Sequence, residues 1–200
     1  EKVSLGYMQA GASAISILTD TLFFKGKNED LTQARKFNFC PILRKDFIID
    51  EYQIVEAKSI GADAILLIAS VLSTEEFKKL VSFTQSLKLE ILLEIQSENE
   101  LEYCSYYSEI VGINNRNLNN FSVDTENSIR LSHLLPSNSL KIAESGIKYP
   151  TDLLNLKKNG FDGFLIGERF MRSASPELEC KFFIKEVELL KNKNNYEPAI

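Results

Sequence analysis

Short apolar segments alternate with helix-like segments along the chain, and this alternation restricts the possible folds more than any other feature. Seven apolar runs recur, and helix-start or helix-stop signals separate each run from the next. Runs that are apolar at almost every position are typical of strands buried on both faces, as in a parallel sheet covered by helices. The strands are expected at 14–18, 42–44, 64–68, 91–95, 110–114, 141–143 and 163–166.

The helices between these strands are expected where capping residues precede helical patterns. Asp50 should begin a helix that Gly61 ends, Ser73 should begin the next helix, and Ser97 carries a similar capping signal after the fourth strand. The last helix is expected at 176–191, so that 1–191 form a single domain and 192–200 a polar tail.

An internal repeat indicates how the units are arranged. Gly11, Gly61 and Gly160 each end a helical pattern and precede a short turn and an apolar strand. Their spacings fit two and four βα units of about 25 residues, the unit length of a (β/α)8 TIM barrel. A helix precedes the first of only seven strands, so the sequence predicts an α/β barrel whose first strand is absent from this chain. We expect further residues before Glu1. An open doubly wound sheet needs no missing strand and is the alternative.

Composition excludes several classes of protein. The chain has 200 residues, 44% hydrophobic and 26% charged, enough for one sizeable core. A formal net charge of -5 argues against nucleic acid as the main partner. The three cysteines form no CxxC motif, which indicates reduced thiols in a cytoplasmic protein and no disulfide or metal site. No apolar run is long enough to cross a bilayer, so no membrane partner is expected.

Polar and glycine residues stand where the expected strands end. In a barrel, the carboxyl ends of all strands surround one mouth, where active sites form. The residues at these ends are Lys45, Glu94, Asn114 with Asn115 and Arg116, Glu144 with Ser145 and Gly146, and Gly167 with Glu168.

Glu94 and Lys45 are the strongest candidates for chemistry. Glu94 interrupts an apolar strand, where a carboxylate costs several kcal/mol unless it is paired, so a tuned acid or base is favoured over a structural ion pair. Lys45 could instead pair with the adjacent Asp46 on a solvated loop. Two strands apart, Lys45 and Glu94 should lie about 10 Å from each other across the mouth. That gap would place a small substrate between a proton donor and a proton acceptor.

Two further groups flank these candidates. Gly146 and Gly167 end the last two strands, where barrels often bind phosphate through backbone N–H groups. Arg169 could assist there or point to solvent. Phe23, Phe24 and Phe47 lie in loops beside strand ends, where core packing is the default and an aromatic substrate pocket is the alternative.

Five segments in unbroken order resemble the indole-3-glycerol-phosphate synthase family of tryptophan biosynthesis. The Leu-Arg-Lys-Asp-Phe sequence within 43–50 is the most specific of them. The resemblance implies a (β/α)8 barrel that needs no cofactor and no metal. The five segments are 15–20, 43–50, 112–116, 144–147 and 167–168, the last with Met171.

The resemblance also implies a reaction and roles for particular residues. A carboxyphenylamino-deoxyribulose 5-phosphate would close a ring onto its own ketone, lose carbon dioxide and then lose water. Lys45 would be a general acid and Glu94 the base. Asn114 and Ser145 would hold substrate hydroxyls or the anthranilate carboxylate, and Arg116 would also bind substrate. Glu144 would orient its neighbours or position Asn114.

Phosphate and the aromatic ring complete the implied substrate site. Gly146 and the backbone of Gly167 and Glu168 would hold the phosphate, with Phe23, Phe24 and Phe47 beside the ring. The family's first strand, which carries a Glu-x-Lys pair and a Ser-Pro-Ser segment, has no counterpart in this sequence. Arg169-Phe170 also replaces the family's small residue and Leu.

Partners and alternatives follow from the same resemblance. The partner would be a phosphorylated small molecule, and the protein a monomer or fused to or associated with other tryptophan-pathway domains. One alternative is another phosphate-binding barrel, such as a sugar-phosphate isomerase or a tryptophan-synthase α-like lyase. The other is a catalytically incomplete barrel that serves as an interaction module.

Overall fold

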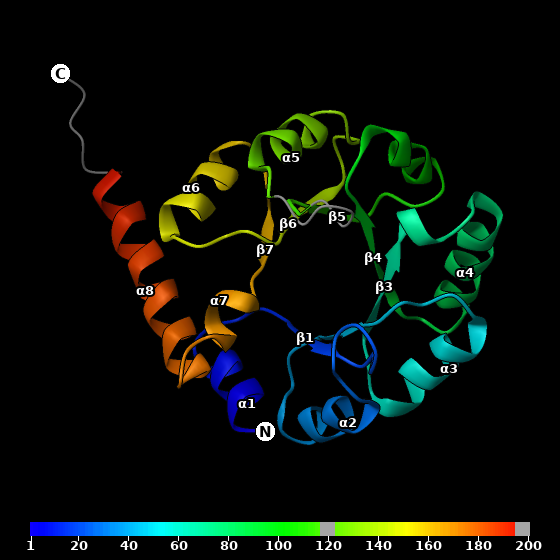
Figure 1. The fold of residues 1–200 in the computed structure, drawn as a ribbon, viewed down its shortest axis with the longest axis horizontal. Helices are drawn as coiled ribbons and strands as arrows, with labels where there is room; N and C mark the ends of the chain where they lie inside the picture. Colours follow the sequence, from blue (N-terminus) through cyan, green and yellow to red (C-terminus); the bar gives the residue numbers. More distant parts are fainter. Residues whose placement is uncertain (117–122, 195–200) are drawn as a thin grey trace.

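The fold is a parallel sheet that curls around a central axis, with helices on its outside (Figure 1). The computed structural model describes residues 1–116 and 123–194. The sheet has seven strands in the order of the sequence, and every adjacent pair is parallel. The strands are β1 (Ile15–Leu18), β2 (Ile42–Lys45), β3 (Ala64–Ile68), β4 (Glu90–Ile95), β5 (Ile110–Asn114), β6 (Leu140–Glu144) and β7 (Gly163–Leu165).

This strand order confirms the barrel prediction and excludes the doubly wound alternative. A doubly wound sheet reverses direction at a switch point, so its strand order departs from the sequence order. Here each strand pairs with its neighbours in the chain, for example Ile15 with Ile42. Within the described residues β1 and β7 lie at the two edges of the sheet and do not pair with each other.

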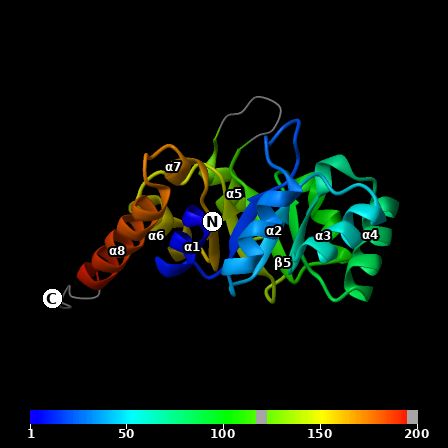
Figure 2. The ribbon, with the colours of Figure 1, turned by 90° about the horizontal axis from the view of Figure 1, so that it is seen from below.

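Helices cover the outside of the sheet, as expected for alternating units. Their axes lie beside the strands in two perpendicular views (Figures 1 and 2). The α-helices are α1 (Lys2–Gln9), α2 (Asn28–Phe37), α3 (Glu51–Ile60), α4 (Thr74–Ser86), α5 (Thr125–Ser132), α6 (Pro150–Lys158), α7 (Glu168–Met171) and α8 (Pro176–Asn194). Two 3₁₀ helices, η1 (Ala69–Val71) and η2 (Glu98–Ser105), complete the set.

Capping residues fix where several helices begin and end. The Asp50 side chain accepts a hydrogen bond from Tyr52 N at the start of α3, and Ser73 forms a capping box with Glu76 at the start of α4, both as predicted. The prediction for Ser97 was wrong: its side chain makes no capping bond, and a 3₁₀ helix follows.

The C-terminal part of the chain differs from the prediction in two places. The short helix α7 was not expected, because four residues are too few to show a helical period. Helix α8 extends to Asn194, so the first three residues of the expected polar tail are helical. Residues 195–200 of that tail lie outside the described residues. The division into one domain and a tail stays a prediction.

The repeat seen in the sequence corresponds to a shared local structure. Gly11, Gly61 and Gly160 all adopt positive φ, as expected for residues that end helices in the left-handed conformation. After Gly61, the Asp63 carboxylate accepts a hydrogen bond from Ile42 N at 2.8 Å; after Gly160, Asp162 accepts one from Lys141 N at 3.0 Å. In both places the aspartate ties its strand to the start of the preceding strand.

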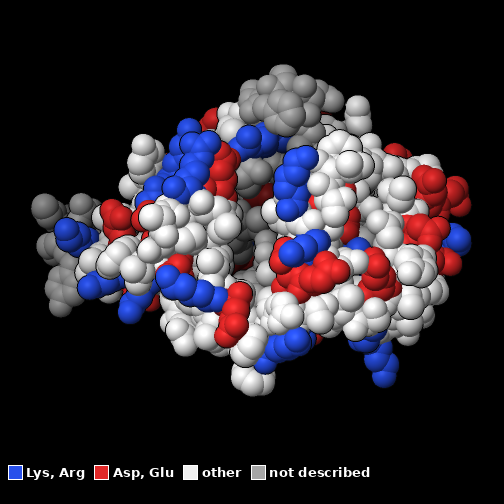
Figure 3. Space-filling view, turned by 60° about the horizontal axis from the view of Figure 1, so that its bottom comes forward, with Lys and Arg blue, Asp and Glu red and all other residues white. Residues whose placement is uncertain are grey.

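The apolar core has two layers, one on each face of the sheet. The outer layer lies between strands and helices and includes Ile54, Phe77 and Phe161, all fully buried. The inner layer, inside the curl, consists of Leu43, Leu66, Ile68 and Leu92. In space-filling view the surface is hollowed near its centre, and charged side chains lie around the hollow (Figure 3).

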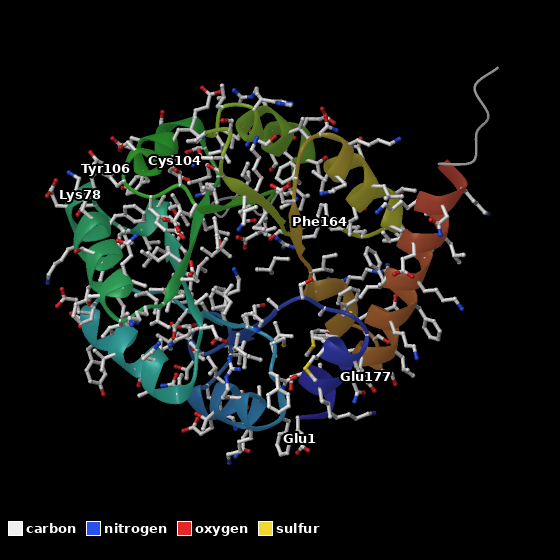
Figure 4. The ribbon with its side chains drawn as sticks, turned by 180° about the vertical axis from the view of Figure 1, so that it is seen from behind. Glu1, Lys78, Cys104, Tyr106, Phe164 and Glu177 are labelled. Atoms are coloured by element: carbon white, nitrogen blue, oxygen red, sulfur yellow. The ribbon has the colours of Figure 1, made fainter. Side chains whose placement is uncertain are left out.

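Side-chain contacts on the outside join neighbouring helical segments. Glu177 at the start of α8 lies beside α1 (Figure 4) and pairs with Lys2 at 2.9 Å. On the opposite flank the Lys78 ammonium lies 4.3 Å from the ring centroid of Tyr106. Among the described helices, none combines the length and apolar character that a membrane span requires.

Candidate active site

The carboxyl ends of β2, β4, β5 and β6 bring four polar side chains together at one mouth of the curled sheet. Lys45 ends β2, Asn114 ends β5 and Glu144 ends β6, while Glu94 is the last residue but one of β4. Both glutamates are almost fully buried, with 4% of Glu94 and 1% of Glu144 exposed. Buried carboxylates of this kind need partners, and the lysine provides one for each of them.

Lys45 bridges the two glutamates. Its Nζ lies 3.3 Å from Oε2 of Glu94 and 3.2 Å from Oε2 of Glu144. The expected separation of about 10 Å between Lys45 and Glu94 was therefore wrong. That spacing holds for strand backbones, whereas the side chains converge inside the curl and the long lysine reaches across it.

The alternative pairing of Lys45 with its neighbour Asp46 is also wrong. Successive residues of a strand point to opposite faces, so Lys45 and Asp46 face different sides of the sheet. The Asp46 carboxylate instead accepts hydrogen bonds from Thr19 Oγ1 at 2.6 Å and from the Arg44 guanidinium at 2.9 Å.

Burial and mutual charge shift the pKa values in this cluster. Burial raises the pKa of Glu144 to about 7; the charge of Lys45 opposes the shift and that of Glu94 adds to it. Burial alone would lower the pKa of Lys45, but the charges of Glu144 and Glu94, with hydrogen bonds to both, raise it above its ordinary value. Near neutral pH the cluster thus combines a persistent ammonium with a carboxyl group that exchanges its proton.

Asn114 extends the cluster toward β5. Its Nδ2 donates to Oε1 of Glu94 at 2.9 Å, and its Oδ1 accepts from Arg116 N at 3.0 Å. The amide is thus held by Glu94, which corrects the expectation that Glu144 would position Asn114. Glu144 contacts Lys45 instead, so its orienting effect acts on the lysine.

Gly112 on β5 is a residue that the sequence reasoning missed. A Cβ atom at this position would collide with Oε1 of Glu144, and that oxygen is buried with no hydrogen-bond partner among the described residues. A glycine inside an apolar strand often marks a close approach by another group, so the signal was present in the sequence.

The three candidate phenylalanines pack beside Lys45. The Phe47 ring lies 4.9 Å from that of Phe24 and 5.2 Å from that of Phe23, centroid to centroid. Lys45 Nζ lies 6.0 Å from the Phe24 centroid, within the range of a cation–π contact. Asp20 holds this loop, since its Oδ2 accepts hydrogen bonds from the backbone N–H groups of Phe23 and Phe24. Phe23 is 73% exposed, so it is not a core residue.

The ends of β6 and β7 carry the residues predicted to bind phosphate. Ser145 and Gly146 both adopt positive φ, at 65° and 72°, and form a tight turn after β6. Asn115 is buried, and its Nδ2 donates to the Ser145 carbonyl at 2.7 Å, so it supports this turn. Its place directly after a strand was the available signal, yet no role was predicted for it.

Gly167 precedes α7, and the side chain of the next residue joins two arginines. The Glu168 carboxylate lies 2.6 Å from Arg116 Nη2 and 2.6 Å from Arg172 Nη2. The expectation that Arg169 points to solvent was wrong, and a part in phosphate binding stays a prediction. Its guanidinium donates to the Lys148 carbonyl, pairs with Glu179 at 2.6 Å and stacks on Phe183, so it fastens α7 to α8.

A polar pocket of about 490 Å³ adjoins the mouth beside α5 and η2. Asn114 links this pocket to the Lys45 cluster. Among the described residues, no group of three His, Cys, Asp or Glu side chains could hold a metal ion. The pocket is lined by Gln96, Ser97, Glu98, Asn99, Asn114, Asn115, Asp124, Asn127 and Arg130.

This chain is similar in sequence to a family of known proteins. Residues 1–183 match the model of the family described as indole-3-glycerol phosphate synthase. A protein of that name from Bacteroides thetaiotaomicron is 47% identical over 188 residues, which cover 94% of this chain and 72% of the relative. One from Campylobacter fetus is 48% identical over 175 residues, covering 87% of this chain and 68% of the relative.

Solved structures of more distant proteins share the fold. The tryptophan synthase alpha subunit of Legionella pneumophila superposes with a TM-score of 0.67 at 15% identity, covering 96% of this chain and 87% of that one. A structure titled KGPDC from Streptococcus mutans gives 0.65 at 14% identity, covering 94% and 93%. At such low identity these likenesses concern the barrel architecture alone.

Proposed function

This chain belongs to the indole-3-glycerol phosphate synthase family, and we propose that the cluster around Lys45 is its active site. The reaction would convert 1-(2-carboxyphenylamino)-1-deoxyribulose 5-phosphate into indole-3-glycerol phosphate. It proceeds by ring closure, loss of carbon dioxide and loss of water. The activity would be that of a carbon–carbon lyase in tryptophan biosynthesis, with a phosphorylated small molecule as substrate.

Ring closure requires an acid at the substrate ketone, and we assign this role to Lys45. The attack of the aromatic carbon on the ketone places negative charge on the ketone oxygen, and a proton donor stabilises that charge. The Lys45 ammonium is held in place by Glu94 and Glu144 and stays protonated at neutral pH. A second acid must assist the departing hydroxyl group in the later dehydration.

Dehydration also requires a base that removes a proton beside the ring, and we assign this role to Glu94. Its carboxylate is buried, and its two oxygens accept hydrogen bonds from Asn114 and Lys45. These bonds fix its orientation, which matters because proton transfer depends on short and aligned contacts. Glu144 would keep Lys45 in position, and Asn114 and Ser145 would bind substrate hydroxyls.

The remaining groups fit the ends of the substrate. Phe23, Phe24 and Phe47 would contact the aromatic ring, since they form one cluster beside Lys45. Arg116 would bind the carboxylate that is lost as carbon dioxide. Backbone N–H groups at Gly146, Gly167 and Glu168 would bind the phosphate. The predicted cytoplasmic location, and the predicted monomer or association with other tryptophan-pathway domains, stay predictions.

The observation that carries the proposal is the single ammonium shared by two buried carboxylates at the strand ends. The test is to assay the complete protein for formation of indole-3-glycerol phosphate, with Lys45→Ala and Glu94→Gln as variants. Each should lose at least about 100-fold in kcat, the usual contribution of a general acid or base. Lys79→Ala serves as control, because Lys79 pairs with Glu51 on the helical surface.

Two results would contradict the proposal. Full activity in both variants would remove the assignments of Lys45 and Glu94. Absence of the indole product from the unsubstituted protein would overturn the function itself and would favour another phosphate-binding barrel or a catalytically incomplete one. Trial of sugar phosphates and of indole-3-glycerol phosphate cleavage would then separate those two alternatives.

A further inference from the structure

Three charged residues in succession at the end of β2 are divided between the two faces of the sheet. Lys45 points into the curl toward Glu94 and Glu144. Arg44 points to the outer face, where its guanidinium donates to the Gln53 carbonyl at 2.8 Å and pairs with Glu56 at 2.7 Å, both on α3. Only 3% of Arg44 is exposed, so a buried cation stands directly behind the proposed acid.

Asp46 completes a buried network around this guanidinium. Its Oδ2 accepts hydrogen bonds from Arg44 Nη2 at 2.9 Å and from Thr19 Oγ1 at 2.6 Å. Arg44 Nε lies 3.0 Å from Thr19 Oγ1, so the network joins the ends of β1 and β2. Asp46 is 6% exposed and Thr19 is 5% exposed. Such a closed set of charge-assisted hydrogen bonds has few alternative geometries.

The same network holds the backbone of Phe47. Asp46 Oδ1 accepts from Phe47 N at 2.8 Å, and Gln53 Nε2 donates to the Phe47 carbonyl at 2.9 Å. Hydrogen bonds thus hold both the backbone N–H and the backbone carbonyl of Phe47. Its ring packs against Phe24 next to Lys45. The residues before and after Lys45 in the sequence are therefore held by hydrogen bonds.

We infer that Arg44 and Asp46 are positioning residues, which hold the end of β2 so that Lys45 and Phe47 project into the mouth in a fixed geometry. This inference rests on the function proposed above, and it concerns residues that touch no substrate. Misplacement of a reacting group by about 1 Å can cost on the order of 100-fold in rate, so such restraint has catalytic value.

If Arg44 and Asp46 only stabilised the fold, other side chains could take their place. Buried ion pairs can often be replaced by apolar groups of similar size without loss of stability. The chain also supplies a matched comparison at the opposite end of β2. Arg35 there donates to the carbonyls of Gly61 and Asn38 and pairs with Asp63, far from the mouth.

The experiment compares a double variant, Arg44→Met with Asp46→Asn, with Arg35→Met in the complete protein. The double variant removes both charges of the buried Arg44–Asp46 pair, and of the partners of Arg44 only the partly exposed Glu56 is left without its cation. The amide oxygen introduced by Asp46→Asn would still accept the Phe47 N–H bond. We expect kcat to fall about 10- to 100-fold with KM changed less than about threefold. Arg35→Met should leave both near the parent values, measured where circular dichroism shows all proteins folded.

A second readout does not depend on activity. The Lys45 amine is labelled with acetic anhydride, and its modified fraction is compared with that of other lysines by mass spectrometry. In the parent, two carboxylates hold Lys45 and should protect it; in the double variant its labelling should rise severalfold, and in Arg35→Met it should not. The single variant Asp46→Asn keeps the contacts of Arg44 with α3 and should show the same changes at smaller size. It replaces the double variant in the test if the double variant fails to fold.

The outcomes separate this inference from the proposed function. Unchanged kcat and unchanged Lys45 labelling in the double variant would overturn the positioning role, as would equal effects in Arg35→Met. If the parent forms no indole product, the proposed function fails, and the labelling result alone then decides whether Arg44 and Asp46 hold Lys45 in place.

Discussion

Lys45 Nζ lies 3.2 Å from Oε2 of Glu144, although 99 positions separate the two residues in the sequence. The contact exists only because β2 and β6 face each other across the curled sheet. Together with Glu94, the two residues form a buried group of one amine and two carboxyl side chains. An excess negative charge is costly in such a place, and for that reason the pKa of Glu144 rises with burial.

Removal of the ammonium should destabilise the protein in a pH-dependent way. In Lys45→Met, Glu94 and Glu144 lose their shared cation, and a buried charge left without its partner typically costs about 3–5 kcal/mol. The loss should be largest near pH 7 and smaller near pH 5, where Glu144, whose pKa is raised to about 7, carries a proton and needs no cation. Urea unfolding at both pH values measures it. An equal loss in the surface variant Lys79→Met would contradict this explanation.

Glu144 itself should make stability fall as pH rises. Its pKa is raised to about 7 from an ordinary value of 4.5. Between these values the folded protein holds a proton that the unfolded chain has released, so raising the pH through this window lowers the free energy of unfolding. Glu144→Gln has no such group. Relative to the parent, the variant should therefore gain stability from pH 5 to pH 7, as measured by urea unfolding.

A matched control isolates this effect. Glu90→Gln replaces an exposed carboxylate at the start of β4, so it should leave the pH slope of the parent unchanged. A Glu144→Gln variant with the same slope as the parent would show that the carboxyl is ionised throughout the window.

Much of this architecture could be predicted from local sequence, because local physics determines it. Apolar runs give the seven strands, and Asp50 and Ser73 show where helices begin. The identity of residues at strand ends also indicated which side chains share a mouth. The 3₁₀ helix after β4 and the short α7 could not be predicted, since neither has a sequence period long enough to detect.

Side-chain partners were the part that sequence could not provide. The strand spacing suggested an open gap between Lys45 and Glu94, whereas the curl of the sheet brings them into contact. The partners of Glu144 and Arg169 depend on distances between residues far apart in the chain, which no local pattern contains. The collision that a side chain at Gly112 would cause is likewise visible only once β5 and β6 lie together.

Arg116 and Glu168 should have opposite effects on substrate binding. Arg116 now pairs with the Glu168 carboxylate at 2.6 Å, and an anionic substrate would compete for the same guanidinium. Arg116→Ala should raise KM about tenfold or more, since a hydrogen bond to a charged group contributes roughly 1.5–3 kcal/mol. Glu168→Ala should not raise KM, because it frees the arginine and leaves the backbone N–H groups in place. Steady-state kinetics of the complete protein measures both.

Arg172 provides the control for this pair. It also contacts Glu168, but its side chain is 79% exposed, so its pairing is weak. Arg172→Ala should change KM less than Arg116→Ala does. If the two variants were equivalent, the binding of the anion would reflect the general charge of the rim, and Arg116 would have no specific role.

Two helix-ending glycines should respond differently to the same substitution. Gly61 and Gly160 both adopt positive φ, at 99° and 88°, where an alanine costs about 1–2 kcal/mol. A Cβ atom on Gly160 would meet no atom within 4 Å, whereas one on Gly61 would lie 2.8 Å from Cγ of Arg35. Gly160→Ala should therefore lose stability only through the strained backbone conformation. Gly61→Ala should lose more stability, because the Arg35 side chain must also move away from the two carbonyls to which it donates. Urea midpoints at equal m-values compare the two variants, and a larger loss in Gly160→Ala would show that Arg35 adjusts without cost.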